Sequence, residues 1–143
     1  MKSSARNQYD GTVLNVHHGA VNDEVEIVLD GGNTRITSVV TSTSVRTLGL
    51  ESGKKVVVLI KAPWVILVTD AKGVRFSARN QLTGTIVAVK DGAVNAEVDL
   101  RLEGGEAMTV IVTEGSVKNL GLAPGQSVTA LVKASHVILG VRE

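Results

Sequence analysis

The pentapeptide SARNQ, at Ser4–Gln8, occurs again without change at Ser77–Gln81. Most of its residues are polar, whereas a hydrophobic core constrains apolar pattern and volume and tolerates exchange among Val, Ile and Leu. The repetition extends well beyond the motif, because 4–32 aligns with 77–105 and, after a gap of one residue, 40–67 aligns with 112–139. The first block contains 17 identical pairs and the second contains 15. The chain is therefore a tandem duplication.

Each copy has an apolar period of two, which is typical of strands, over most of its length. A segment that breaks this period, Thr41–Gly49, has hydroxyl residues able to cap a helix at its start and a glycine at its end. Three strands, a short helix and two strands is the element order of an OB-type Greek-key barrel. The predicted fold is thus all-β, with two tandem OB-like five-stranded barrels and a short helix between strands 3 and 4 of each. The strands are expected at Thr12–Val16, Val25–Leu29, Thr34–Val40, Lys55–Lys61 and Trp64–Thr69, then at Gly84–Val89, Glu97–Leu102, Met108–Val112, Ser127–Lys133 and Val137–Val141.

The duplication predicts a first domain over residues 1–70, a linker over 71–76 and a second domain over 77–143. The linker is short and polar and contains a glycine, as expected of a flexible connection. A unit this small buries only about 60% of the surface that its unfolded chain exposes. We therefore expect further association between chains.

The amino-acid composition restricts the classes of function that this protein can have. The formal net charge is +1, which argues against a general nucleic-acid or membrane-surface binder. The chain has no cysteine and only three aromatic residues, Tyr9, Trp64 and Phe76. OB folds bind single strands by stacking bases on aromatics along a basic groove, so single-stranded nucleic-acid binding stays as the alternative reading. The polar start of the chain predicts a soluble, cytoplasmic protein without a membrane span.

A functional site inherited with the repeat should be present in both copies. None of the three histidines, His17, His18 and His136, is matched by a histidine in the other copy. A catalytic triad or a histidine metal site is therefore possible in one copy at most. The only carboxylate pair that recurs is Glu24/Glu97, which is expected to pair with a cation or face water. The sequence predicts a binding protein rather than an enzyme.

The polar residues shared by both copies suit an oxyanion, because Arg, Lys and hydroxyl side chains all donate hydrogen bonds. A site built only of donors favours a fully deprotonated tetrahedral dianion such as sulfate, molybdate or tungstate. Each residue also has a structural interpretation, with the hydroxyls as helix caps and the amides as braces of a turn. The shared donors are Ser4, Arg6, Thr41, Ser44 and Lys61, and their counterparts Ser77, Arg79, Thr113, Ser116 and Lys133.

The SARNQ motif, the "GAVN" of Gly19–Asn22 and Gly92–Asn95, "LGL" and "LIKAPWVIL"/"LVKASHVIL" together resemble the Mop domain, and the pair of repeats resembles the tandem molbindins. The resemblance implies OB-like barrels that bind molybdate, with tungstate as a mimic, for intracellular storage or buffering. It also implies a homotrimer with sites between domains. It adds Ala62 and Ala134 to the donors named above, as part of a Lys-Ala pair.

The resemblance further implies a second kind of oxyanion site at the GAVN turns, with mainly backbone donors. One departure between the copies is Pro63, which faces Ser135 and has no backbone N–H to donate, so the two copies are expected to differ in affinity. A third interpretation is a purely structural assembly module in which SARNQ flanks an interface. The residues of the second kind of site are Ala20, Val21, Asn22, Ala93, Val94 and Asn95.

Overall fold

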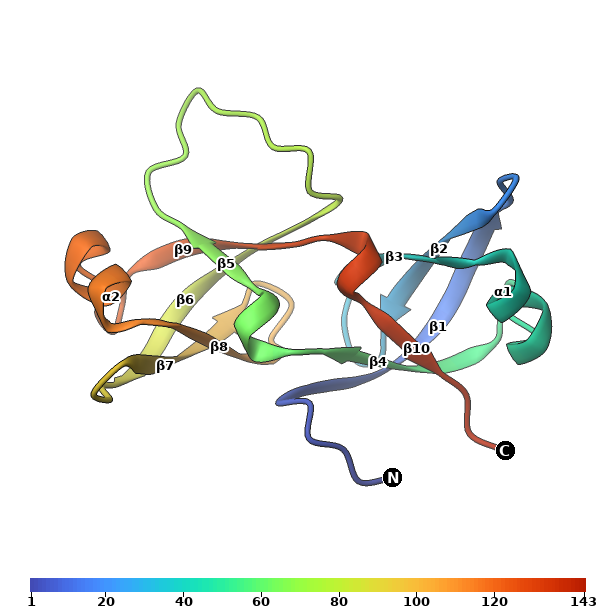
Figure 1. The fold of residues 1–143 in the computed structure, drawn as a ribbon, viewed down its shortest axis with the longest axis horizontal. Helices are drawn as coiled ribbons and strands as arrows, with labels where there is room; N and C mark the ends of the chain where they lie inside the picture. The colour runs from blue at the N-terminus through green and yellow to red at the C-terminus, as the bar shows by residue number, and fades with distance from the viewer.

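The computed structural model describes residues 1–143 and contains two five-stranded antiparallel sheets (Figure 1). The first repeat forms β1 (Asn7–His17), β2 (Asn22–Leu29), β3 (Arg35–Thr41), α1 (Ser42–Leu48), β4 (Lys55–Ile60), the 3₁₀ turn η1 (Ala62–Trp64) and β5 (Ile66–Val68). The second repeat forms the same elements as β6 (Asn80–Lys90), β7 (Asn95–Leu102), β8 (Ala107–Thr113), α2 (Glu114–Leu120), β9 (Ser127–Val132), η2 (Ala134–His136) and β10 (Ile138–Gly140). The predicted all-β fold with two OB-like units is confirmed.

The last strand of each repeat lies in the sheet of the other repeat. The strand orders are β10-β4-β1-β2-β3 and β5-β9-β6-β7-β8. Ile66 of the first repeat pairs with Leu131, and Ile138 of the second pairs with Leu59. A division at residues 71–76 therefore separates the two sequence repeats, but each sheet takes one strand from across that division.

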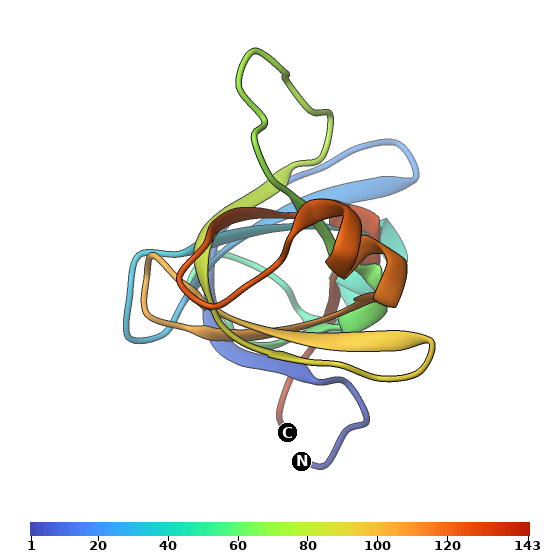
Figure 2. The ribbon, with the colours of Figure 1, turned by 90° about the vertical axis from the view of Figure 1, so that its left-hand side faces the viewer.

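The exchanged strands are shorter than expected, and in the first repeat part of the predicted segment is a 3₁₀ turn. The expected strand Trp64–Thr69 is reduced to Ile66–Val68, with Trp64 in η1. Pro63 suits this turn, since its fixed φ and missing N–H are tolerated at the start of a helix. The linker that follows leaves the body of the molecule as a projecting loop, and the two chain ends lie near each other (Figures 1 and 2).

The first strand of each repeat is longer than predicted and begins inside SARNQ. Asn7 starts β1 and Asn80 starts β6, so that the motif feeds directly into the sheet. β1 pairs with β4 along its first half and with β2 along its second. Gly11 lies where these pairings overlap, and a Cβ there would approach Ile27 Cγ2 to 2.7 Å. Because Gly11 has no side chain, β2 can approach closely at the residue where β1 pairs with both β2 and β4.

The helices match the prediction. Thr41 caps α1, and Gly49 ends it in the left-handed conformation with φ 63°. The Leu50 N–H donates to Val45 O at 2.9 Å, and both side chains are buried. Twenty-seven buried apolar residues from both repeats form one continuous core. No helix is long and apolar enough to cross a membrane.

Candidate functional site

The two asparagines of the repeated motif join the halves. Asn7 Nδ2 donates to Thr109 O at 2.8 Å, and Thr109 N donates to Asn7 Oδ1 at 2.7 Å. Asn80 makes the same two bonds to Thr37, at 2.8 and 2.7 Å. Both asparagines are 2% exposed. Each side-chain amide thus makes the two hydrogen bonds that a neighbouring strand would make to the edge of the other sheet. This role is more specific than the bracing of a turn.

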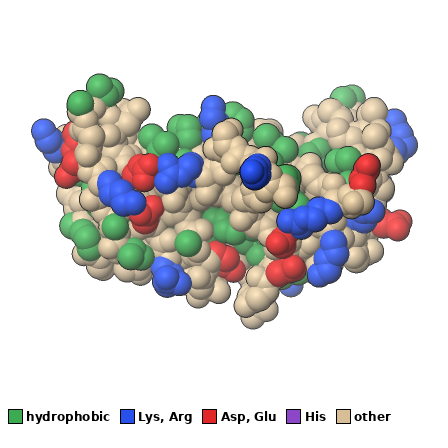
Figure 3. Space-filling view, turned by 90° about the horizontal axis from the view of Figure 1, so that it is seen from below, with side chains coloured by type: hydrophobic (Ala, Val, Ile, Leu, Met, Phe, Trp, Pro, Cys, Tyr) green, Lys and Arg blue, Asp and Glu red, His purple; other side chains and the backbone are tan.

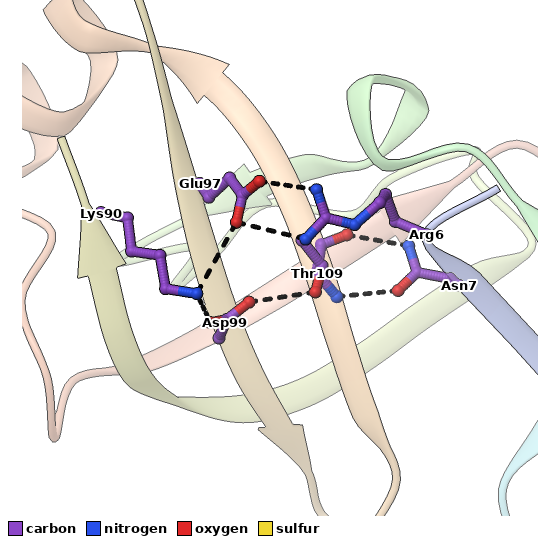
Figure 4. A network of polar contacts seen from close by, with 6 residues as sticks. All are labelled: Arg6, Asn7, Lys90, Glu97, Asp99 and Thr109. Carbon is purple, nitrogen blue, oxygen red and sulfur yellow. Dashed lines mark hydrogen bonds and ion pairs between the residues drawn. The ribbon is translucent and has the colours of Figure 1, made fainter. Parts of the chain in front are cut away.

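The arginines of the motif also cross to the other repeat. Arg6 Nη1 and Nη2 donate to Glu97 Oε1 and Oε2 at 2.6 and 3.2 Å (Figure 4). Arg79 Nη1 forms the equivalent ion pair with Glu24 Oε1. The hydrogen bond from Arg6 and its charge lower the pKa of Glu97, and the same contact raises the pKa of Arg6. Glu24 and Glu97 therefore pair with cations, one of the two outcomes expected from the sequence.

The ion pair of Arg6 belongs to a wider network on the second sheet. Lys90 Nζ lies 3.9 Å from Glu97 Oε2 and 3.6 Å from Asp99 Oδ2. Asp99 Oδ1 in turn accepts a bond from Thr109 Oγ1 at 3.0 Å. Figure 4 shows these side chains converging from β6, β7 and β8 on the start of β1.

The threonines and serines at the helix starts cap the helices. Ser44 N donates to Thr41 Oγ1 at 3.1 Å, and the two hydroxyls are 2.9 Å apart. Thr113 and Ser116 repeat both distances. Thr41 and Thr113 remain exposed, so their hydroxyls still face solvent.

One cavity, of about 450 Å³, contains the SAR and Lys-Ala residues of the second repeat. Val39 and Ser135 line both this cavity and the neighbouring hollow over α1, which Asn22, Thr41 and Ser44 also line. The strand register accounts for the position of the cavity beside the hollow. Glu24, the partner of Arg79, pairs with Val39, and two positions along the same strands Asn22 pairs with Thr41 at the start of the helix. Arg79, held by Glu24, thus lies next to the helix start of the other repeat. The expected residues that share the cavity are Ser77, Arg79, Lys133 and Ala134.

The pseudo-symmetric arrangement recurs at the other end of the molecule. A hollow over α2 is lined by Asn95, Thr113 and Ser116 together with Pro63 from η1. Arg6 reaches this side through Glu97, which pairs with Ile111 two positions from Thr113. Ser4 and Lys61 are exposed at the start of the chain and before η1, and Ala62 is buried. The Lys61 ammonium lies 5.5 Å from the centre of the Trp64 ring.

The sequence grouped six donors within each repeat, whereas the structure combines repeats. We define composite cluster A as Ser77, Arg79, Lys133 and Ala134 with Thr41 and Ser44. By the pseudo-symmetry of the repeats we group Ser4, Arg6, Lys61 and Ala62 with Thr113 and Ser116 as composite cluster B, although only Thr113 and Ser116 of these six line the hollow over α2. The resemblance implied sites between domains, but sequence reasoning did not predict which residues combine, because the strand exchange and the cross-repeat ion pairs decide this. The recurrence of Glu24 and Glu97 was the signal that could have revealed it.

The GAVN turns project from the sheets. Val21 and Val94 are 72% and 74% exposed. A Cβ on Gly19 or Gly92 would lie 2.3 Å from the carbonyl oxygen of the asparagine three residues later, so both turns require glycine. The carbonyl of Val21 accepts from Ser42 N, at 2.9 Å. Ala20, Asn22, Ala93 and Asn95 complete the two turns and are exposed.

The histidines do not form a metal site. No group of three or more His, Asp or Glu side chains is placed to hold a metal ion. His18 Nδ1 lies 2.9 Å from Asp23 Oδ2, and His136 stacks on Trp64 with ring centres 5.0 Å apart. Basic and acidic side chains are intermixed on the face shown in Figure 3, without an extended basic patch.

These features define a duplicated, strand-exchanged OB-like protein with two clusters of hydrogen-bond donors. The TOBE domain family matches residues 3–67 and again residues 77–139. The chain therefore belongs to the TOBE domain family, and the resemblance to tandem Mop-domain proteins is confirmed.

Comparison with solved structures places a molybdate-bound protein very near this one. The cytoplasmic molybdate-binding protein ModG, solved with molybdate bound, is 55% identical with a TM-score of 0.95, over 99% of this chain and 100% of that chain. The molybdenum-pterin-binding protein MopA of Rhodobacter capsulatus is 45% identical over 99% of this chain and 53% of its own length. The molybdenum transport protein ModE of Azotobacter vinelandii is 45% identical over 99% of this chain and 52% of its own. The chain thus spans about half the length of these two curated relatives.

Proposed function

We propose that this protein binds molybdate, with tungstate as a mimic, and stores and buffers the oxyanion in the cytoplasm. The observation that carries the proposal is the gathering of guanidinium, ammonium and hydroxyl donors in composite cluster A. Such donors suit a fully deprotonated tetrahedral dianion. The similarity to ModG, which was solved with molybdate bound, supports molybdate as that dianion.

Each composite cluster supplies one site in this proposal. In cluster A, Arg79 and Lys133 provide the positive charge, while Ser77, Thr41 and Ser44 provide hydroxyls. In cluster B, Arg6 and Lys61 take the same roles with Ser4, Thr113 and Ser116. Ala62 and Ala134 contribute backbone groups beside the lysines. No organic cofactor and no bare metal ion is part of this proposal.

A second kind of site at the GAVN turns and a homotrimer complete the proposal. Several large apolar side chains are exposed on the turns and on the short exchanged strands, where a partner chain would bury them and gain hydrophobic stabilisation. These side chains are Val21, Ile66, Val94 and Ile138.

The proposed role is binding without catalysis and without nucleic acid. The chain has only three aromatic residues, and none of them recurs in the other repeat. Tyr9 donates its hydroxyl to Ala107 O at 2.7 Å, and its burial raises its pKa, while Trp64, which is 37% exposed, stacks on His136. Three unmatched aromatics do not supply the row of stacking platforms along a groove that OB folds use for single strands.

The decisive experiment is equilibrium dialysis against molybdate followed by metal analysis, with calorimetry for affinity. We expect tight binding of molybdate and tungstate, weaker binding of sulfate and very weak binding of phosphate. Absence of molybdate binding, or equal affinity for phosphate, would contradict the proposal.

Replacement of the two arginines tests the assignment of the clusters. Arg6→Ala and Arg79→Ala are each expected to remove part of the bound molybdate, because each deletes the fork of donors of one cluster. Arg46→Ala, on an exposed face of α1, is the matched control and should bind like the wild type. An unchanged stoichiometry in the Arg6/Arg79 double variant would remove the arginines from the site.

A further inference from the structure

The guanidinium of each composite cluster already has an anion bound to it. Glu97 contacts both terminal nitrogens of Arg6, and Glu24 contacts Arg79. In both cases the carboxylate comes from the repeat that also supplies the helix-start hydroxyls of that cluster. An oxyanion entering either cluster therefore meets an arginine whose charge is neutralised.

The backbone next to each arginine is anchored independently of the glutamates. The residue after Arg6 is Asn7, whose amide makes two bonds to the backbone of Thr109. Asn80 fixes the backbone next to Arg79 on Thr37 in the same way. Because these buried amides anchor the chain, the distinctive contribution of Glu97 and Glu24 is their negative charge.

The ion pairs are open to competition. The side chains of Arg6 and Glu97 are 47% and 29% exposed, so solvent screens their attraction and the pair is weak. A dianion carries twice the charge of a carboxylate and would also receive bonds from a lysine and several hydroxyls. Lys90, 3.9 Å from Glu97, offers that carboxylate another cation when Arg6 turns to the oxyanion.

We propose that Glu24 and Glu97 are resident counter-anions, which compete with the bound oxyanion for Arg79 and Arg6 and thereby weaken its binding and hasten its release. This inference rests on the proposed oxyanion sites. It gives a storage protein a reason to keep a carboxylate in each site, since a reversible store must release its contents.

The test is calorimetric titration of molybdate into the wild type and into Glu24→Gln, Glu97→Gln and the double variant. Glutamine keeps the shape and one acceptor but removes the charge, so we expect affinity to rise about three- to tenfold, as expected for removal of a partly screened charge near a dianion. Stopped-flow displacement of molybdate by excess tungstate should show slower release. Glu26→Gln is the matched control, because it makes the same charge change two residues along β2 at a carboxylate that bonds Asn15 instead of an arginine.

The outcomes separate the two proposals. If the wild type binds no molybdate, the proposed function and this inference both fail. If the wild type binds and the glutamine variants bind equally or more weakly while retaining their fold, the counter-anion role alone is wrong. An equal gain in Glu26→Gln would reduce the effect to net charge and also overturn it. Should a glutamine variant not fold, Glu97→Asp, which shortens the side chain and loosens its hold on Arg6, should still raise the affinity.

Discussion

The two halves of the molecule share one backbone plan but secure the same turn with different residues. In the first half, Asp23 on β2 accepts bonds from Gly19 N at 3.1 Å and from Ser42 Oγ at 2.6 Å. In the second half an alanine stands at the position of Asp23, and Glu114 at the start of α2 accepts from Gly92 N at 3.2 Å. The acceptor has moved from strand to helix while the turn is unchanged. The comparison teaches that the N–H of this turn requires an acceptor, not a particular residue.

Other side chains at equivalent positions of the two halves also make different contacts. Lys90 in the network around Glu97 is matched by His17, which lies 3.9 Å from Glu26. Tyr9, which bonds across to Ala107, is matched by Leu82. By contrast, the clamping asparagines and the paired arginines and glutamates are identical in both halves. The asparagine clamps and the Arg–Glu pairs that join the halves are thus duplicated, whereas Tyr9, which also joins them, and the residues that support the turns differ.

The largest expected effect is the loss of a clamp that both halves share. Asn7→Ala and Asn80→Ala each leave a buried backbone N–H and C=O without partners, which costs about 1–3 kcal/mol per group. We expect each variant to lose about 2–4 kcal/mol of unfolding free energy, and both variants to lose similar amounts. Urea unfolding measures this directly. A loss below about 0.5 kcal/mol, within the usual range for surface substitutions, would show that water replaces the amide.

A smaller effect should distinguish the two halves in how the stability of the protein depends on pH. Bonds from Ser42, Gly19 and His18 lower the pKa of Asp23 below its ordinary value of 3.8. A carboxylate with a lowered pKa stabilises the folded state above its unfolded-state pKa, and this contribution is lost as the pH falls through the folded value. Below about pH 4, we therefore expect the unfolding free energy of Asp23→Asn to fall less steeply with decreasing pH than that of the wild type.

Urea unfolding between pH 7 and pH 3 checks this prediction. Part of the acid dependence should persist in Asp23→Asn, because Arg6 lowers the pKa of Glu97 as well. Glu114→Gln, which changes the equivalent acceptor in the second half, is the matched control for the loss of a turn acceptor. Identical acid limbs in Asp23→Asn and the wild type would refute the role of Asp23.

The smallest effect concerns the residue that directly follows the Lys-Ala pair, which differs between the clusters. Pro63 has no backbone N–H, whereas Ser135 has one. Ser135 also lines both the cavity and the hollow of cluster A. One hydrogen bond contributes about 1 kcal/mol, so Pro63→Ser should raise the affinity of cluster B about fivefold. Calorimetry that separates the two classes of site is the measurement, with Pro124→Ser in a distant loop as the control. Equal affinities in the wild type would remove the basis of this prediction.

Much of the fold was determined by the sequence itself, because its signals are local. The duplication is visible in the identical pairs, the strands in the apolar period, and the helix limits in Thr41 and Gly49. These features depend on backbone preferences and on partners a few residues away. The donors of the proposed sites were also found, since duplication retained them in both copies.

The tertiary structure alone decided how those residues are combined. Nothing local to Ile66 or Ile138 indicates that each strand joins the other sheet, because either sheet offers the same apolar edge. The partners of Arg6 and Asn7 lie 91 and 102 residues away in the chain. Contacts of that range depend on how the two halves pack, and the halves have nearly the same sequence. The sequence therefore identified the repeated donors, and the packing of one repeat against the other decided which of them lie near each other.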